Sequence, residues 1–191
     1  MNKIVLASKS DARRSILEQI GFKVIVCYPK VSEIQINHGS LKDVINIAKE
    51  NSFNKAMYAK KCYSYPVISA DTLIFQKSKI FGKSRNKEEA KNMLISLRGT
   101  FHRVVTGYTI LYKNDKITGY DITEVYMRNY SEEEINYYLK TNEWIGKAGS
   151  YAIQGIGAFL VKRINGCYYN VVGLPLSKLI EDLKILGLWP P

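Results

Sequence analysis

The stretch KIVLASKSDARRSILEQIGFKVIVC, residues 3–27, determines the fold class of this chain. It begins with a short apolar run of the kind that forms a buried strand. Ser10 then stands at an N-cap position, apolar residues follow at helical spacing, and Gly21 ends the helix. Residues 23–27 are apolar again and predict a second strand. A strand, a helix and a strand in succession are typical of an α/β protein.

The same signals continue through the rest of the chain. We expect helices over 40–61, 86–99, 131–140 and from Pro175 to about Leu186, and strands over 66–75, 79–82, 101–113, 116–127, 158–164 and 167–172. Two of these strands are joined by the short turn at Asn114 and Asp115 and must be antiparallel. The pattern therefore predicts a mixed β-sheet flanked by helices. Since no repeat or linker interrupts it, we expect one domain over residues 1–191.

Capping residues mark the start of two of these helices. Ser40 with Asp43, and Ser131 with Glu134, have the spacing of a capping box. For the helix that starts after Ser40, helical spacing makes the following residues candidates for the buried face: Leu41, Val44, Ala48, Ala56 and Met57.

Composition and charge limit the possible functions. The chain has 191 residues and a formal net charge of +11, which is compatible with nucleic-acid binding. The basic residues are nevertheless spread along the chain, and no basic-aromatic repeat of the kind that stacks bases is present. We therefore expect no stable complex with nucleic acid. Small phosphorylated anions fit the charge equally well.

The cysteines and the hydropathy pattern exclude other classes. Three widely spaced cysteines and two scattered histidines support neither a disulfide framework nor a zinc site. The N-terminus lacks the pattern of a secretory signal, and no run approaches the roughly 20 apolar residues of a membrane span. We expect a cytoplasmic protein without membrane association.

The turn ASKSDARR after the first strand is the first candidate for chemistry. A helix N-terminus offers free backbone N–H groups that bind phosphate. Ser8 and Ser10 add hydroxyl groups, and Arg13 adds a guanidinium that can bind an anion through two N–H groups. The alternative is an ordinary capped helix with arginines that face solvent.

Asp71 is the second candidate, because a lone carboxylate inside the apolar run PVISADTLIF is costly unless it is paired or bound to metal. At the end of a strand it could coordinate Mg²⁺ or accept a proton from water, and Thr72 beside it adds a second polar group. The alternative is a structural, hydrogen-bonded aspartate.

Two lysines next to glycines form a third group. Lys83 lies in FGKS and Lys147 in GKAG, where each could reach an anion that also contacts backbone amides. Taken singly, each is equally an exposed surface lysine. The segment GKAGSYAIQGIGAFLV, residues 146–161, is rich in glycine and forms either a pair of turns or a loop that cradles a ligand. Neither GxxxxGK[ST] nor GxGxxG is present.

Taken in order, these segments resemble the Maf family of nucleoside triphosphate pyrophosphatases, which is related in fold to the inosine triphosphate pyrophosphatases. The resemblance rests on LASKSDARRSIL, SADTLI, FGKSRNKEEAKNMLISLRGTFHRVVTG and KAGSYAIQGIGAFLVKRINGCYYNVVGLPLSKL. It implies an inosine triphosphate pyrophosphatase-like fold with two lobes and a central cleft, and it suggests a homodimer.

The resemblance also implies an activity, namely hydrolysis of a nucleoside triphosphate to the monophosphate and pyrophosphate with Mg²⁺ or Mn²⁺. The aspartate of the family's ADT motif falls on Asp71, which would accept the proton and bind the metal, with Glu33 as its partner at the metal. The family's cleft groups would correspond to Ser8, Arg13, Lys55, Lys83 and Lys147. The alternative is a non-catalytic, nucleotide-binding regulator of cell division.

Specificity follows from the same resemblance. The branch that acts on dTTP and UTP has arginine at the position of Ala12, while Thr72 and Gln154 match that branch. Arg14 would point about 200° away from Ala12 on an ideal helix, so it is a poor substitute. The resemblance favours dTTP, UTP or modified pyrimidine nucleotides. Gln154, which offers a donor and an acceptor, would read the base, and Gly155 would let backbone amides approach it. On this basis Gly155→Val should weaken nucleotide binding more than folding.

Overall fold

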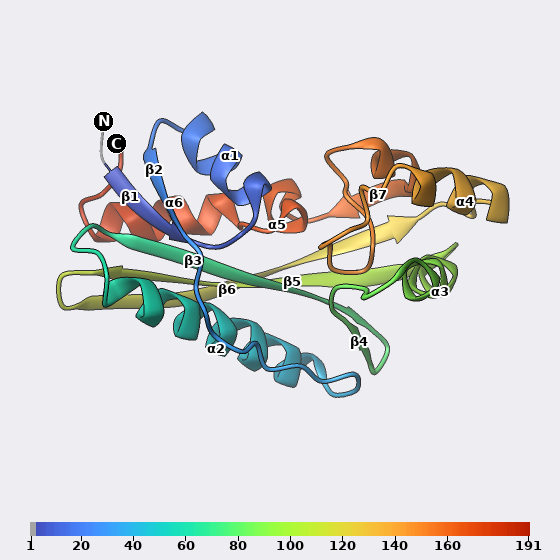
Figure 1. The fold of residues 1–191 in the computed structure, drawn as a ribbon, viewed down its shortest axis with the longest axis horizontal. Helices are drawn as coiled ribbons and strands as arrows, with labels where there is room; N and C mark the ends of the chain where they lie inside the picture. Colours follow the sequence, from blue (N-terminus) through green and yellow to red (C-terminus); the bar gives the residue numbers. More distant parts are fainter. Residues whose placement is uncertain (1–2) are drawn as a thin grey trace.

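The computed structural model describes residues 3–191 and is built on one seven-stranded sheet (Figure 1). The elements are β1 (Lys3–Ala7), α1 (Asp11–Gln19), β2 (Lys23–Cys27), α2 (Leu41–Lys60), β3 (Val67–Gln76), β4 (Lys79–Phe81), α3 (Lys87–Leu97), β5 (Phe101–Tyr112), β6 (Asp115–Met127), α4 (Glu132–Lys140), the 3₁₀ helix η1 (Ile156–Leu160), β7 (Val161–Asn165), α5 (Tyr168–Val172) and α6 (Leu176–Ile185).

The sheet is mixed, as the sequence predicts. Its strand order is β2-β1-β3-β5-β6-β7, with β4 paired to β3. β1 pairs in parallel with both β2 and β3, because α1 and α2 carry the chain back between these strands. The remaining pairs are antiparallel. Both capping boxes form as expected, at the start of α2 and of α4.

One face of the sheet is covered by α2 (Figure 1). Its buried face is rich in alanine and packs on β3 and β5 with an unusually close approach. At Gly107 on β5, the α2 backbone around Ala48 leaves no room for a Cβ atom. Met57 is 40% exposed, contrary to our expectation, because at 100° per residue it lies on the side of α2 opposite Ala48 and Ala59.

The opposite face carries two separate groups of helices, which form the two lobes (Figure 1). One apolar cluster joins α1 and α6 to β1, β3 and β5. A second cluster joins α3 and α4 to the far ends of β5 and β6. The long strands thus pass through both lobes, and a cleft lies between the two helix groups. No helix within residues 3–191 is long and apolar enough to span a membrane.

The C-terminal third differs from the prediction at two points. Residues 156–160 form η1, so the strand expected over 158–164 begins only at Val161. The strand expected over 167–172 is instead the short helix α5. The buried Asn170 side chain donates to Val104 O and Thr123 Oγ1, and these distant contacts override the strand preference of the local Tyr and Val residues.

Candidate active site

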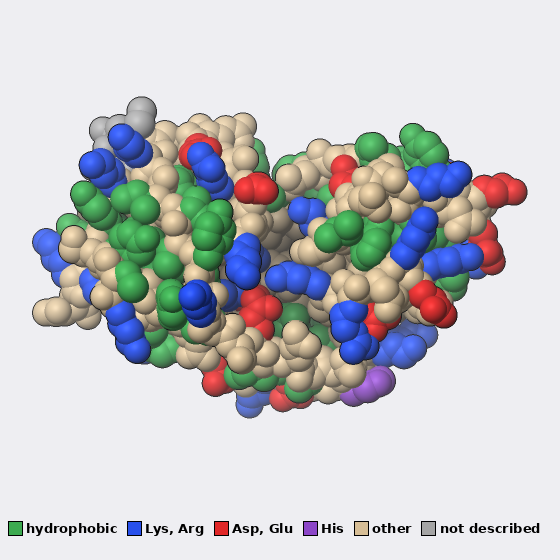
Figure 2. Space-filling view, in the orientation of Figure 1, with side chains coloured by type: hydrophobic (Ala, Val, Ile, Leu, Met, Phe, Trp, Pro, Cys, Tyr) green, Lys and Arg blue, Asp and Glu red, His purple; other side chains and the backbone are tan. Residues whose placement is uncertain are grey.

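The cleft between the lobes has a volume of about 620 Å³ and is lined by five basic and three acidic side chains. Figure 2 shows Lys and Arg side chains gathered around this hollow. The structure brings all nine predicted site residues to its walls, from six separate segments of the chain: Ser8, Arg13, Glu33, Lys55, Asp71, Thr72, Lys83, Lys147 and Gln154. Their proximity in space is a finding, whereas their individual roles remain predictions.

The turn between β1 and α1 forms one wall, and Arg13 fixes it to the rest of the lobe. The Arg13 guanidinium donates to Gly173 O at 2.7 Å, to Ser8 Oγ at 3.0 Å and to Thr72 Oγ1 at 2.9 Å. Burial lowers its pKa, while the charges of Asp71 and Glu33 act in the opposite direction. The Ser10 side chain accepts from the backbone N–H of Arg13 and caps α1. Three of the five guanidinium N–H groups are thus engaged within the protein.

Thr72 continues a chain of hydrogen bonds behind this wall. Its hydroxyl oxygen lies 3.0 Å from Thr106 Oγ1, and Thr106 donates to Asn170 O at 3.1 Å. The single Thr106 proton is used in that second bond, so Thr72 must donate to Thr106 while it accepts from Arg13. Thr72 can therefore offer a ligand only an acceptor.

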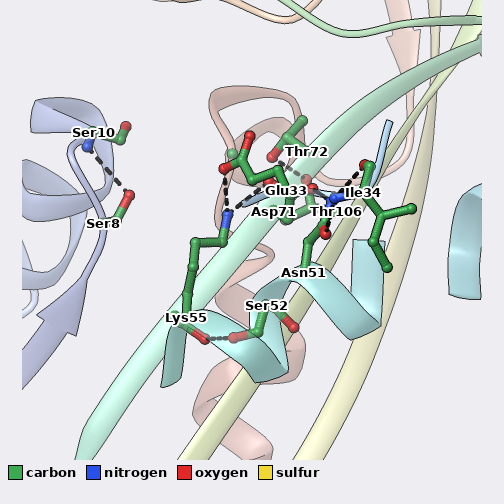
Figure 3. Close-up of polar contacts among 12 residues, drawn as sticks. Ser8, Ser10, Glu33, Ile34, Asn51, Ser52, Lys55, Asp71, Thr72 and Thr106 are labelled. Carbon is green, nitrogen blue, oxygen red and sulfur yellow. Dashed lines mark hydrogen bonds and ion pairs between the residues drawn. The ribbon is translucent and has the colours of Figure 1, made fainter. Parts of the chain in front are cut away.

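The floor of the cleft is the side chain of Asp71, near the middle of β3 and 6% exposed (Figure 3). Lys55 Nζ from α2 lies 2.7 Å from Asp71 Oδ1 and 3.1 Å from Glu33 Oε1. One buried ammonium thus bridges the two carboxylates. Burial would raise the pKa of Glu33, but the charges of Lys55 and Lys83 outweigh it and lower that pKa.

The second wall consists of two loops joined to each other. Lys83 and Ala148 form an isolated antiparallel bridge, and Gly149 N donates to Gly82 O at 3.0 Å. This pairing carries Lys83 and the neighbouring Lys147 to the same side of the cleft. Gly149 has φ +67°, a conformation that favours glycine, and an added Cβ atom would collide with the terminal methyl group of Ile74.

Gly155 has a structural role that the sequence did not indicate. The Glu143 carboxylate accepts from Ile156 N at 3.0 Å and from Gly157 N at 2.8 Å. A Cβ atom at Gly155 would occupy the position of this carboxylate. The free backbone amides expected to approach a ligand are therefore satisfied within the protein, and we now expect Gly155→Val to disturb the loop itself. Gln154, next to it, still lines the cleft.

Asn51 is a site residue that the sequence reasoning missed. It lies on α2 one turn before Lys55, and its Nδ2 donates to Asp71 Oδ2 at 2.9 Å (Figure 3). The available signal was its position: Asn51 follows Val44 by seven residues and Ala48 by three, so helical spacing places it on the expected buried face.

The carboxylates of Glu33 and Asp71 fit a divalent cation in one respect. Both contact the Lys55 ammonium, so they lie close enough together for one divalent cation to contact both through lone pairs that Lys55 does not use. Magnesium is typically held by one or two carboxylates together with water and substrate phosphates. Among residues 3–191 no group of three or more His, Cys, Asp and Glu side chains could hold a metal ion.

Comparison with known proteins gives a consistent result. A family model described as "Maf-like protein" matches residues 3–186. The "dTTP/UTP pyrophosphatase" of Pyrococcus furiosus is 43% identical over 186 residues, covering 97% of this chain and 96% of that protein. The protein of the same name from Bacillus anthracis is 42% identical over 187 residues, covering 96% and 95%.

A solved structure gives a weaker likeness. The Staphylococcus aureus Ham1 protein is 15% identical and aligns with a TM-score of 0.47, covering 67% of this chain and 73% of that one. The family assignment therefore rests on the family model and on the relatives in sequence, which cover nearly the whole chain. This chain belongs to the Maf-like protein family.

Proposed function

We propose that this protein hydrolyses a nucleoside triphosphate between its α and β phosphorus atoms, releasing the nucleoside monophosphate and pyrophosphate. The observation that carries the proposal is the cleft itself, where a buried carboxylate, Asp71, lies among five basic side chains. The relatives named dTTP/UTP pyrophosphatase support it, since they match over almost their full length. They also give no support to the alternative of a non-catalytic regulator of cell division.

The basic groups would bind the triphosphate. A nucleoside triphosphate carries about four negative charges, and phosphoryl transfer depends on positive groups that neutralise them in the transition state. Lys83 and Lys147 reach the cleft from the far wall, while Arg13 and the N-terminus of α1 face them from the near wall. We assign these groups, with Ser8, to the phosphate chain of the substrate.

Asp71 would act as the general base. A water molecule adds to the α phosphorus atom, Asp71 accepts its proton, and the bond from the α phosphorus to the bridging oxygen breaks with pyrophosphate as leaving group. Lys55 holds the Asp71 carboxylate at 2.7 Å and keeps it oriented. A divalent cation such as Mg²⁺ or Mn²⁺, bound by Asp71 and Glu33, would supply charge neutralisation and an activated water.

The base would be read by neutral groups. The Gln154 amide offers both an NH₂ donor group and a carbonyl acceptor, and Thr72 offers an acceptor only. This combination matches the N–H and carbonyl edge of uracil or thymine, and we propose dTTP, UTP or modified pyrimidine nucleotides as substrates. Ala12 cannot supply a guanidinium, and Arg14 lies on another face of α1 in an ion pair with Glu18. Removal of surplus or modified nucleotides is the corresponding cellular role.

A nucleotide panel tests this proposal. Purified protein with Mg²⁺ is incubated with the common and with base-modified nucleoside triphosphates, and the products are separated by chromatography. We expect pyrophosphate and the monophosphate, with pyrimidine substrates turned over fastest. Turnover of purine nucleotides alone would overturn the substrate assignment, and absence of pyrophosphate across the whole panel would overturn the activity. The predicted homodimer is tested separately by light scattering.

A further inference from the structure

Asn51 makes an unusually complete set of hydrogen bonds for a side chain that lies behind the cleft. It is 2% exposed and comes from the middle of α2. Its Nδ2 donates to Asp71 Oδ2 at 2.9 Å and to Ile34 O at 3.1 Å, and its Oδ1 accepts from Ile34 N at 2.8 Å. Both amide protons and the carbonyl oxygen are thus engaged, on two different segments of the chain.

The contacts with Ile34 close a ring between the carboxamide and one backbone residue. Ile34 directly follows Glu33, in the segment 28–37, which contains neither helix nor strand. Such a segment lacks the regular backbone hydrogen bonds that fix the backbone of a helix or a strand. The two bonds to Asn51 therefore hold the backbone next to Glu33 against α2, while the third bond holds Asp71 on β3 (Figure 3).

We propose that Asn51 is a positioning residue that sets the relative placement of the Glu33 and Asp71 carboxylates. This inference rests on the function proposed above, in which these two groups act together. Lys55 also contacts both carboxylates, but through one charged nitrogen at the end of a long stem. The Asn51 carboxamide is neutral and short, and it approaches the Asp71 oxygen that Lys55 does not contact.

The residue type matters for this role. Aspartate at this position would lose both N–H donors and add a third negative charge. Leucine has nearly the same volume but would leave Ile34 N, Ile34 O and one Asp71 oxygen without their partner. Alanine removes the same three bonds without introducing a new group. Replacement of a residue that hydrogen-bonds to a metal-binding side chain typically lowers metal affinity or activity by about 10–100-fold.

The test compares Asn51→Ala and Asn51→Leu with a matched control, Asn54→Ala. Asn54 lies on the same helix but is not among the residues that line the cleft. For each protein, hydrogen exchange of the Ile34 amide is measured in the free state, and kcat and KM are measured from pyrophosphate release at varied Mg²⁺. Thermal unfolding verifies that each variant is folded at the assay temperature.

We expect both Asn51 variants to exchange the Ile34 amide faster and to lose about 10–100-fold in kcat, with a smaller change in the KM for nucleotide. Asn54→Ala should resemble the wild type in each measurement. A kcat within about twofold of the wild type in folded Asn51 variants would overturn the proposal, since a residue that only stabilises the fold would lower the unfolding temperature alone.

The exchange measurement separates this inference from the proposed function. If the wild type and Asn54→Ala release no pyrophosphate, the proposed activity fails, and the exchange result then decides the role of Asn51. Unchanged protection of the Ile34 amide in both Asn51 variants would overturn the positioning role, whatever the reaction.

Discussion

His102 makes the stability of this protein sensitive to acid in a predictable way. It lies on β5, is fully buried, and its Nε2 is 2.9 Å from the hydroxyl oxygen of Tyr151, which lines the cleft. Its Nδ1 has no hydrogen-bond partner within residues 3–191. Burial lowers the pKa of His102 from 6.5 to about 3. The folded protein therefore holds a neutral imidazole over most of the acidic range.

The sign of the effect follows from proton binding. Between pH 6.5 and about 3 the unfolded chain binds a proton at His102 and the folded protein does not. Stability must therefore fall as the pH falls through this window. With one pKa unit equal to about 1.4 kcal/mol, the free energy of unfolding should drop by about 2 kcal/mol at pH 5 relative to pH 7.5 on account of His102 alone.

Denaturant unfolding at pH 7.5 and pH 5.0 measures this loss. The variant is His102→Gln, because its amide can still bond Tyr151 but does not titrate. The control is His38→Gln, because His38 is exposed and the chain has two histidines. Wild type and His38→Gln should lose about 2 kcal/mol more than His102→Gln between the two pH values. An equal loss in all three proteins would refute the reasoning.

Two further predictions concern the cleft and the core. Lys147→Met should raise the KM for nucleotide by about 10–100-fold with a smaller effect on kcat, as expected for a lost bond to phosphate, and steady-state kinetics would show it. An unchanged KM would remove Lys147 from the phosphate site. Gly107→Ala should lower the free energy of unfolding by about 1–3 kcal/mol, because its Cβ would overlap the α2 backbone at Ala48. A variant as stable as the wild type would show that α2 can move away from the sheet.

The parts of the fold that the sequence predicts are those with local causes. The first strand, helix and strand, and the two capping boxes, depend on residues within a few positions of each other, and they form where expected. The segment 167–172 has the composition of a strand, yet it forms α5 because Asn170 bonds partners 47 and 66 positions away. Contacts at such separation leave no signal in a local pattern.

The candidate site divides in the same way. The sequence alone singles out Asp71, a carboxylate in an apolar run, and Lys147, a lysine next to a glycine. The resemblance to a family then predicts that both belong to one site. Helical spacing places Asn51 on the buried face, but its role arises from bonds to residues 17 and 20 positions away, which a local pattern does not show. Gly155 suggested a ligand loop by its type, whereas its actual neighbour is the Glu143 carboxylate.

The most direct test of the central claim is the product pattern of the wild type beside Asp71→Asn. With Mg²⁺ and dTTP or UTP, chromatography should show the wild type releasing the monophosphate and pyrophosphate in equal amounts. Asp71→Asn keeps the shape of the side chain but cannot accept a proton, so its turnover should fall by about 10²–10⁴-fold. Release of the diphosphate and orthophosphate by the wild type, or undiminished turnover by Asp71→Asn, would contradict the account.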